Sequence, residues 1–214
     1  MGEISIIEIL LFLFSYLVGS ISFSYIIGKK IAGIDIRNHG SKNAGATNTL
    51  RVLGKGPAIL VLLLDLLKGS IAVMIAMIFS DSAFVYMLAG LFAIVGHNWP
   101  VFFGFKGGKG VATSIGVIIA LTPIPFLITA IFGLIILYMF RYVSLASIIA
   151  STIYPITIFV MDAPQVYLIG AFAIMALTYI RHRANIRRLL NGTENKLGTK
   201  KPRETEIQKS SGEE

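Results

Sequence analysis

The sequence lacks cysteine and is poor in charged residues. Because none of the 214 residues is Cys, a disulfide framework and any thiolate chemistry are excluded. Only 14% of the residues are charged, against roughly 25% in soluble domains, while 55% are hydrophobic. Such a composition cannot cover a water-facing surface, so lipid must be the solvent for most of the chain.

Common catalytic patterns are missing too. The sequence shows neither paired carboxylates nor a cluster of residues with metal-ligand spacing, so no metal site is expected. None of the three histidines is followed by Asp five positions later, because those positions hold Ala44, Phe102 and Arg187. What is present instead is a series of long apolar runs separated by short polar segments.

These runs predict an all-α integral membrane protein with seven transmembrane helices. A helix needs about 20 apolar residues to cross the hydrocarbon core, and the fourth run is the shortest. The predicted spans are residues 4–28, 57–79, 83–95, 111–121, 126–140, 142–160 and 165–180. We assign residues 1–190 to one membrane domain. Residues 191–214 form a polar tail that we expect to be disordered, because it has little apolar surface to offset chain entropy.

The distribution of positive charge predicts the orientation. Six Lys or Arg residues lie in 29–55, two in 97–110, one at Arg141 and nine after Ile180. The alternate ends of the spans carry acidic residues but no Lys or Arg. Since positive charge marks the cytoplasmic side, the N-terminus is predicted outside and the C-terminus inside. Four polar segments then share the cytoplasmic face.

The most informative of these segments is Gly104-Phe-Lys-Gly-Gly-Lys-Gly110, which we call the glycine cradle. Glycines let backbone N–H groups approach an anion closely, and a helix that starts just after them adds its positive end. Lys109 supplies a full charge. It is followed by Gly110 rather than Ser or Thr, so the segment is not a nucleotide-hydrolysing P-loop. A flexible basic turn beside a membrane helix is the simpler interpretation of this segment alone.

The other polar segments allow similar pairs of interpretations. Residues 40–51 are rich in small hydrogen-bonding side chains and end at Arg51, which suits a phosphate but also an ordinary solvated loop. Asp65 and Lys68, three residues apart in an apolar run, favour a structural ion pair. The last span ends in His182 and Asn185 on one helical face, a position that also suits lipid headgroups.

Together these patterns leave three classes of function. An anion or phosphate-ester transporter needs many spans and a basic site, but such sites generally lie near the bilayer midplane. A scaffold that binds anionic lipid would explain the basic loops, though not the Gly-Lys and Ser/Asn blocks. An enzyme at the cytoplasmic surface, which joins a water-soluble phosphate compound to a hydrophobic chain, fits all the blocks.

Six blocks in this order closely resemble the PlsY family of bacterial acyl-phosphate:glycerol-3-phosphate acyltransferases. The blocks are Gly19-Ser-Ile, GSKNAGATNTLR, DLLKG, GHNWPVFFGFKGGKGVAT, RYVSLAS and TYIRHRANIRRLLNGTE. They are distributed from about residue 16 to residue 194. The family has seven membrane helices and a cytoplasmic active site. The chain departs from it at Lys42, where Gly is common in the family.

The resemblance implies transfer of a fatty acyl group from acyl phosphate to the 1-hydroxyl of sn-glycerol 3-phosphate. The products would be lysophosphatidic acid and phosphate, with no cofactor. Membrane lipid would be the environment, nucleic acid would not be a partner, and we expect a monomer. The base is either the substrate phosphate or His182. The implied catalytic residues are Lys109, His182, Ser41 and Asn185, and the implied substrate-binding residues are Asn43, Asn48, Arg51, Gly107, Gly108, Gly110, Ser144, Ser147 and His97.

Overall fold

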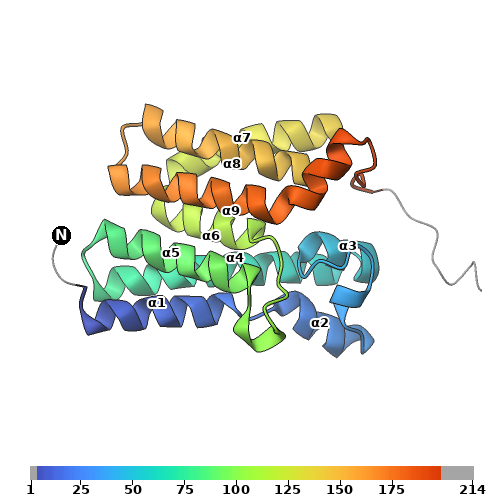
Figure 1. Cartoon of the computed structure of the whole chain (residues 1–214), viewed down its shortest axis with the longest axis horizontal. Coiled ribbons are helices and arrows are strands. Elements are labelled where there is room, and N and C mark those ends of the chain that lie inside the picture. The colour runs from blue at the N-terminus through green and yellow to red at the C-terminus, as the bar shows by residue number, and fades with distance from the viewer. Residues whose placement is uncertain (1–3, 199–214) are drawn as a thin grey trace, which may run out of the picture.

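The computed structural model describes residues 4–198, and all regular secondary structure in that range is helical (Figure 1). This confirms the predicted all-α class. The α-helices are α1 (Ile6–Gly19), α2 (Phe23–Ala32), α3 (Ala46–Leu53), α4 (Lys55–Phe79), α5 (Ala83–Asn98), α6 (Val111–Leu121), α7 (Pro123–Phe140), α8 (Val143–Val160) and α9 (Gln165–Leu190). Two 3₁₀ turns, η1 (Ile36–Asn38) and η2 (Val101–Phe103), lie in the connecting loops. Residues 199–214, most of the predicted tail, lie outside the described range.

Five segments of the described chain are long and apolar enough to cross a membrane. They are Ile6–Ala32, Lys55–Phe79, Ala83–Phe103, Pro123–Phe140 and Val143–Val160. Helix α6, with 11 residues, is shorter than the roughly 20 residues that a full span needs. By length and composition these five segments fit a multi-pass membrane protein, and the count of seven stays a prediction.

The first apolar run is not one continuous helix. It breaks between α1 and α2, where the backbone carbonyl of Ile21 accepts a hydrogen bond of 2.7 Å from Lys68 Nζ. This donor lies 47 residues away in the sequence, so the composition of the run alone did not reveal the break. The polar loop predicted from residue 29 is likewise partly helical, because it contains the last turn of α2 and all of α3.

Small residues bring the helices close together. Helix α4 packs against α5 and α6, while α1 packs against α5. At Gly116 of α6, an added Cβ would lie 1.9 Å from the carbonyl oxygen of Leu66, and at Gly19 of α1 one would lie 2.1 Å from that of Ala93. In lipid, where association depends on close backbone packing, these glycines fix which helices become neighbours.

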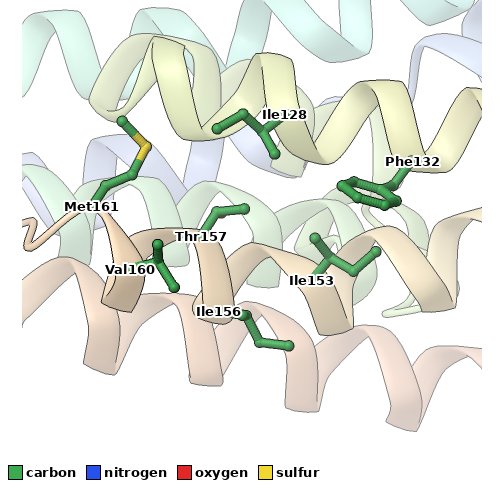
Figure 2. A pocket seen from close by; sticks show the side chains of 7 residues that line it. All are labelled: Ile128, Phe132, Ile153, Ile156, Thr157, Val160 and Met161. Carbon is green, nitrogen blue, oxygen red and sulfur yellow. The ribbon is translucent and has the colours of Figure 1, made fainter.

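The outward surface of the α7–α8 pair is apolar. Figure 2 shows a groove between these helices that is lined by Ile128 and Phe132 of α7 and by Ile153 and Thr157 of α8. The hydroxyl of Thr157 donates to the carbonyl of Tyr154 within its own helix, so the groove offers no free polar group. An apolar surface of this kind suits contact with lipid chains.

The polar segments gather at one end of the bundle. Figure 1 shows α2, α3 and the C-terminal end of α9 at the end opposite the N-terminus. The loop from α5 to α6, which contains the glycine cradle, reaches the same end. The segments rich in Lys and Arg are therefore neighbours in space, although they are distant in sequence.

Candidate active site

The glycine cradle lies directly on the C-terminal end of α5. The N–H of Gly108 donates to the carbonyl of His97 at 3.1 Å. A Cβ at Gly107 would lie 2.1 Å from that carbonyl oxygen, and one at Gly108 would lie 2.1 Å from Nε2 of His97. Gly110, with φ of 80°, is the N-cap of α6. Glycine is therefore required at these positions by contact and by backbone conformation, and the cradle leads straight into a helix N-terminus.

Arg181 of α9 holds the cradle from the other side. Its guanidinium donates to the carbonyl of Gly108 at 2.6 and 3.0 Å and to that of Gly107 at 3.1 Å. The same group lies over the ring of Trp99, 5.2 Å from its centroid. With the two carbonyls bound to Arg181, the cradle has a fixed shape. We did not single out Arg181 from the sequence, although its place beside His182 at the predicted exit from the membrane was a usable signal.

Lys109 points from the cradle to the last helix. Its Nζ donates to Oδ1 of Asn185 at 2.5 Å, which joins two blocks that are 76 residues apart. Burial lowers the pKa of Lys109 to about 8, and the nearby cations Arg188 and Arg51 act in the same direction. The carboxylate of Glu194 opposes this shift. Lys109 is thus a partly desolvated ammonium whose charge an incoming anion would stabilise.

Glu194 is the second group that the sequence did not reveal. Its Oε1 accepts hydrogen bonds from Asn185 at 2.8 Å and from Ser144 at 3.0 Å, and its Oε2 accepts one from Arg188 at 2.7 Å. Burial alone would raise the pKa of this carboxyl, but the hydrogen bonds that it accepts hold the pKa below its usual value. A carboxylate from the segment after α9 therefore accepts hydrogen bonds from donors on two helices, α8 and α9.

His182 is buried beside this cluster. Its Nδ1 lies 2.9 Å from the backbone carbonyl of Thr178. A carbonyl oxygen only accepts hydrogen bonds, so Nδ1 must carry the proton, and Nε2 of the neutral ring keeps its lone pair. His182 thus has the protonation state of a potential base.

The first polar loop is organised around Asn48, which is fully buried. Its Oδ1 accepts from both the N–H and the hydroxyl of Ser41, and its Nδ2 donates to the carbonyls of Ile36 and His39. All the hydrogen bonds of Asn48 in the described chain therefore serve the loop. Lys42, beside Ser41, has a φ of 59°, a conformation that glycine adopts more easily.

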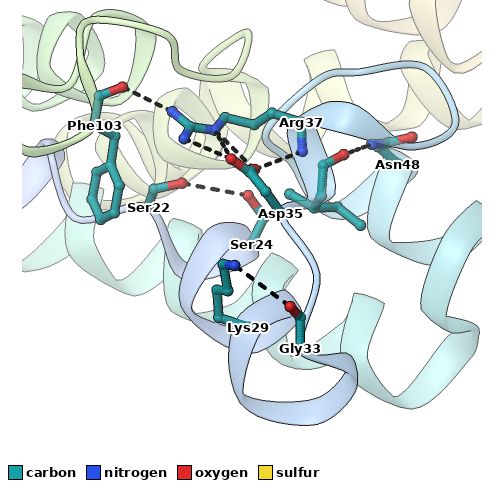
Figure 3. Close-up of polar contacts among 9 residues, drawn as sticks. Ser22, Ser24, Lys29, Gly33, Asp35, Arg37, Asn48 and Phe103 are labelled. Carbon is teal, nitrogen blue, oxygen red and sulfur yellow. Dashed lines mark hydrogen bonds and ion pairs between the residues drawn. The ribbon is translucent and has the colours of Figure 1, made fainter.

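Two contacts attach this loop to the glycine cradle. Arg37 forms an ion pair with Asp35 at 2.8 Å and donates to the carbonyl of Phe103 in η2 at the same distance (Figure 3). The carbonyl oxygen of Ala44 lies against Gly108, where an added Cβ would be 2.3 Å from it. The blocks at 41–51, 107–110 and 182–185 therefore lie together, as the sequence led us to expect.

The remaining predicted site residues make fewer connections. Arg51 is close enough to Glu194 and Lys109 for their charges to interact. Ser147 donates to the carbonyl of Val143 in its own helix, and Asn43 accepts at its backbone carbonyl from the N–H of Gly45. Within residues 4–198, no three His, Cys, Asp or Glu side chains are arranged to hold a metal ion.

Comparison with known proteins identifies the family of this chain. A family profile described as glycerol-3-phosphate acyltransferase matches residues 9–192. The chain belongs to the glycerol-3-phosphate acyltransferase family. A member from Halalkalibacterium halodurans is 50% identical over 90% of this chain and 96% of its own length. One from Shouchella clausii is 53% identical over 88% and 95%, respectively.

Solved structures agree with this assignment. The chain resembles the crystal structure of PlsY, an integral membrane glycerol 3-phosphate acyltransferase, in its glycerol 3-phosphate form. The TM-score is 0.85 at 47% identity, over 90% of this chain and 96% of that one. The lysophosphatidic acid form of PlsY gives a TM-score of 0.83 at 46% identity, with the same coverage. The transporter interpretation finds no support in these comparisons.

Arg181→Met should weaken binding of glycerol 3-phosphate. Hydrogen bonds from a charged donor contribute about 1.5–3 kcal/mol, so losing those to the cradle should raise KM for this substrate by about tenfold or more. Steady-state kinetics of the purified variant measure this effect. Arg183→Met is the matched control, because Arg183 is exposed on the same helix. Equal KM values for the two variants would show that Arg181 does not shape the cradle.

Proposed function

We propose that this chain transfers a fatty acyl group from acyl phosphate to the 1-hydroxyl of sn-glycerol 3-phosphate. The observation that carries the proposal is the hydrogen bond from Lys109 in the glycine cradle to Asn185 in α9. It brings the ammonium, the helix N-terminus and the His182 imidazole to one place at the end of the bundle. Together these groups can hold phosphate groups beside an acyl carbonyl.

The reaction needs little chemistry from the protein. The substrate hydroxyl oxygen attacks the carbonyl carbon of the mixed anhydride, the bond from that carbon to the phosphate oxygen breaks, and phosphate leaves with the electron pair. Lys109 and the backbone N–H groups of the cradle stabilise the negative charge that develops. The hydroxyl proton has two possible acceptors, Nε2 of His182 and an oxygen of a substrate phosphate. Ser41 and Arg51 are proposed to contact phosphate, and Asn48 to hold their loop.

The site's position favours an enzyme over a transporter. Donors and cations lie at one end of the bundle rather than halfway along the helices, where transporter sites are generally found. An acyl donor with a phosphate head would place its head at this end and its chain along the apolar helices. The transporter alternative has no observation of its own in the described chain.

The purified protein should release phosphate only when acyl phosphate and glycerol 3-phosphate are both present. Lys109→Met should lower this rate by about 10²-fold or more, because it removes the cation that faces the developing charge. Lys106→Met is the matched control, since Lys106 lies exposed in the same cradle. Phosphate release that does not depend on glycerol 3-phosphate, or turnover unchanged in Lys109→Met, would contradict the proposal.

Activity should also depend on the protonation of Lys109. Because its pKa lies at about 8, kcat/KM for glycerol 3-phosphate should fall as the pH rises through that value. The fall should approach about tenfold per pH unit above it, since only the protonated amine binds phosphate. Lys109→Arg keeps its charge throughout this range and should lose the alkaline limb. An identical alkaline limb in wild type and Lys109→Arg would assign the titration to another group.

We further propose seven spans in a bacterial inner membrane, with the N-terminus outside and the site in the cytosol. Positive residues at one end of the bundle and acidic ones at the other support this orientation. The cysteine-free chain allows a direct check with single cysteines. In intact cells an impermeant maleimide should label Asp81→Cys, whereas Lys55→Cys should react only after permeabilisation. The reverse pattern would invert the topology.

A further inference from the structure

Helix α4 buries a complete ion pair that the proposed reaction does not use. Lys68 Nζ lies 2.8 Å from Oδ1 of Asp65, and both side chains are 2% exposed. The pair was predicted from the i, i+3 spacing and is confirmed. Stability alone is a weak reason for such a pair, because well-packed apolar residues of similar volume are often as stable or more so. We therefore looked for what each partner contacts beyond the other.

Lys68 completes its interactions away from the site. Its ammonium donates to the carbonyl of Ile21 in the break between α1 and α2, and it lies 5.6 Å from the ring centroid of Phe23. Neither partner belongs to the glycine cradle. Lys68 thus neutralises Asp65 and binds the helix break, whereas any connection to the site must run through Asp65.

Asp65 faces the site through His97. Its Oδ1 lies 3.5 Å from Nδ1 of the imidazole and has no well-directed hydrogen bond within the described chain. The carboxylate only accepts hydrogen bonds, so a contact with His97 needs the ring proton on Nδ1. This polar acceptor on α4 is therefore suited to fix the rotation of an imidazole on α5.

The rotation of His97 determines where the cradle can lie. The imidazole Nε2 occupies the space beside the α carbon of Gly108, where a Cβ would lie 2.1 Å from it. The backbone carbonyl of His97 also accepts the N–H of Gly108. A rotated ring would either press on Gly108 or leave it unsupported, and Lys109 follows directly in the chain.

We propose that His97 is a positioning residue for the glycine cradle and that Asp65 sets its orientation from inside the membrane. Lys68 neutralises Asp65 and is dispensable once residue 65 carries no charge. His97, implied as a substrate-binding residue by the family resemblance, thus acts on the substrate through Gly108 and Lys109. The inference rests on the proposed function, because its readout is acyl transfer.

Two double variants separate this role from simple stabilisation. D65N/K68M and D65L/K68M both remove the ion pair, but only the first keeps an oxygen that can accept from His97. We expect D65N/K68M to keep kcat/KM close to wild type. D65L/K68M should lose about 10²-fold, mainly through a higher KM for glycerol 3-phosphate, since small misplacements of binding groups have effects of this size. Thermal unfolding in detergent should be similar for the two. Folded double variants with equal kcat/KM would overturn the proposal.

A third variant decides the matter if either double variant fails to fold. His97→Phe keeps an aromatic side chain, somewhat larger than imidazole, and leaves the ion pair in place, but it removes the ring nitrogens. It should lower kcat/KM by about 10²-fold on its own. Where D65L/K68M folds, combining it with His97→Phe should add no further loss, because both act through one contact. Wild-type kcat/KM in His97→Phe would overturn the inference. A wild-type protein without acyl transfer would instead reject the proposed function, so the two failures are distinguishable.

Discussion

The α carbon of Gly108 is where the parts of the candidate site meet. The end of α5, the first polar loop and the guanidinium of Arg181 all lie against this residue or its carbonyl. Any side chain there would collide with His97 or with Ala44. Because Gly108 has no Cβ, the end of α5 and the first polar loop can both pack directly against its backbone, while Arg181 binds its carbonyl. These contacts determine the shape of the cradle. Lys109 is positioned as a consequence.

Around that point the hydrogen bonds form a directed series. Glu194 only accepts, so the Nδ2 amide group of Asn185 must face it, and the amide oxygen of Asn185 must face Lys109. The orientation of one amide is thus set by a carboxylate on one side and an ammonium on the other. The carboxylate also offsets part of the cost of burying several cations together. Its charge acts on Lys109 in the direction opposite to that of Arg188.

Local sequence was sufficient for those features that depend on neighbouring residues. The helical class, the break after Phe79 and the pair of Asp65 with Lys68 all follow from composition or from spacing of a few residues. The glycine cradle drew attention through its four glycines and two lysines just before an apolar run, although a flexible basic turn was the simpler interpretation of that segment alone. Even its partner Asn185 was found, since it lies one helical turn from His182 in a polar exit from a membrane span.

What the sequence left hidden depends on residues far apart. Arg181 was indistinguishable from any arginine at a membrane surface until its contacts with Gly107 and Gly108, more than 70 residues away, were visible. Glu194 lies in a segment whose low apolar content predicted disorder, and its role comes from donors on α8 and α9. At the break between α1 and α2, Lys68 binds the carbonyl of Ile21, which lies 47 residues earlier in the chain.

These long-range contacts also explain why the site lies at the end of the bundle rather than within it. In lipid, each cation, carboxylate or free N–H needs a partner. At the end of the bundle, the first polar loop, the glycine cradle, the start of α8 and the end of α9 supply these partners, and water stays within reach. The ion pair placed deeper in the described chain, on α4, has partners on two other segments, which are Ile21 between α1 and α2 and His97 under the cradle. Burial at that depth keeps water from competing for the Asp65 carboxylate. An acceptor on a rigid, tightly packed helix then holds its neighbour more firmly than a surface carboxylate would.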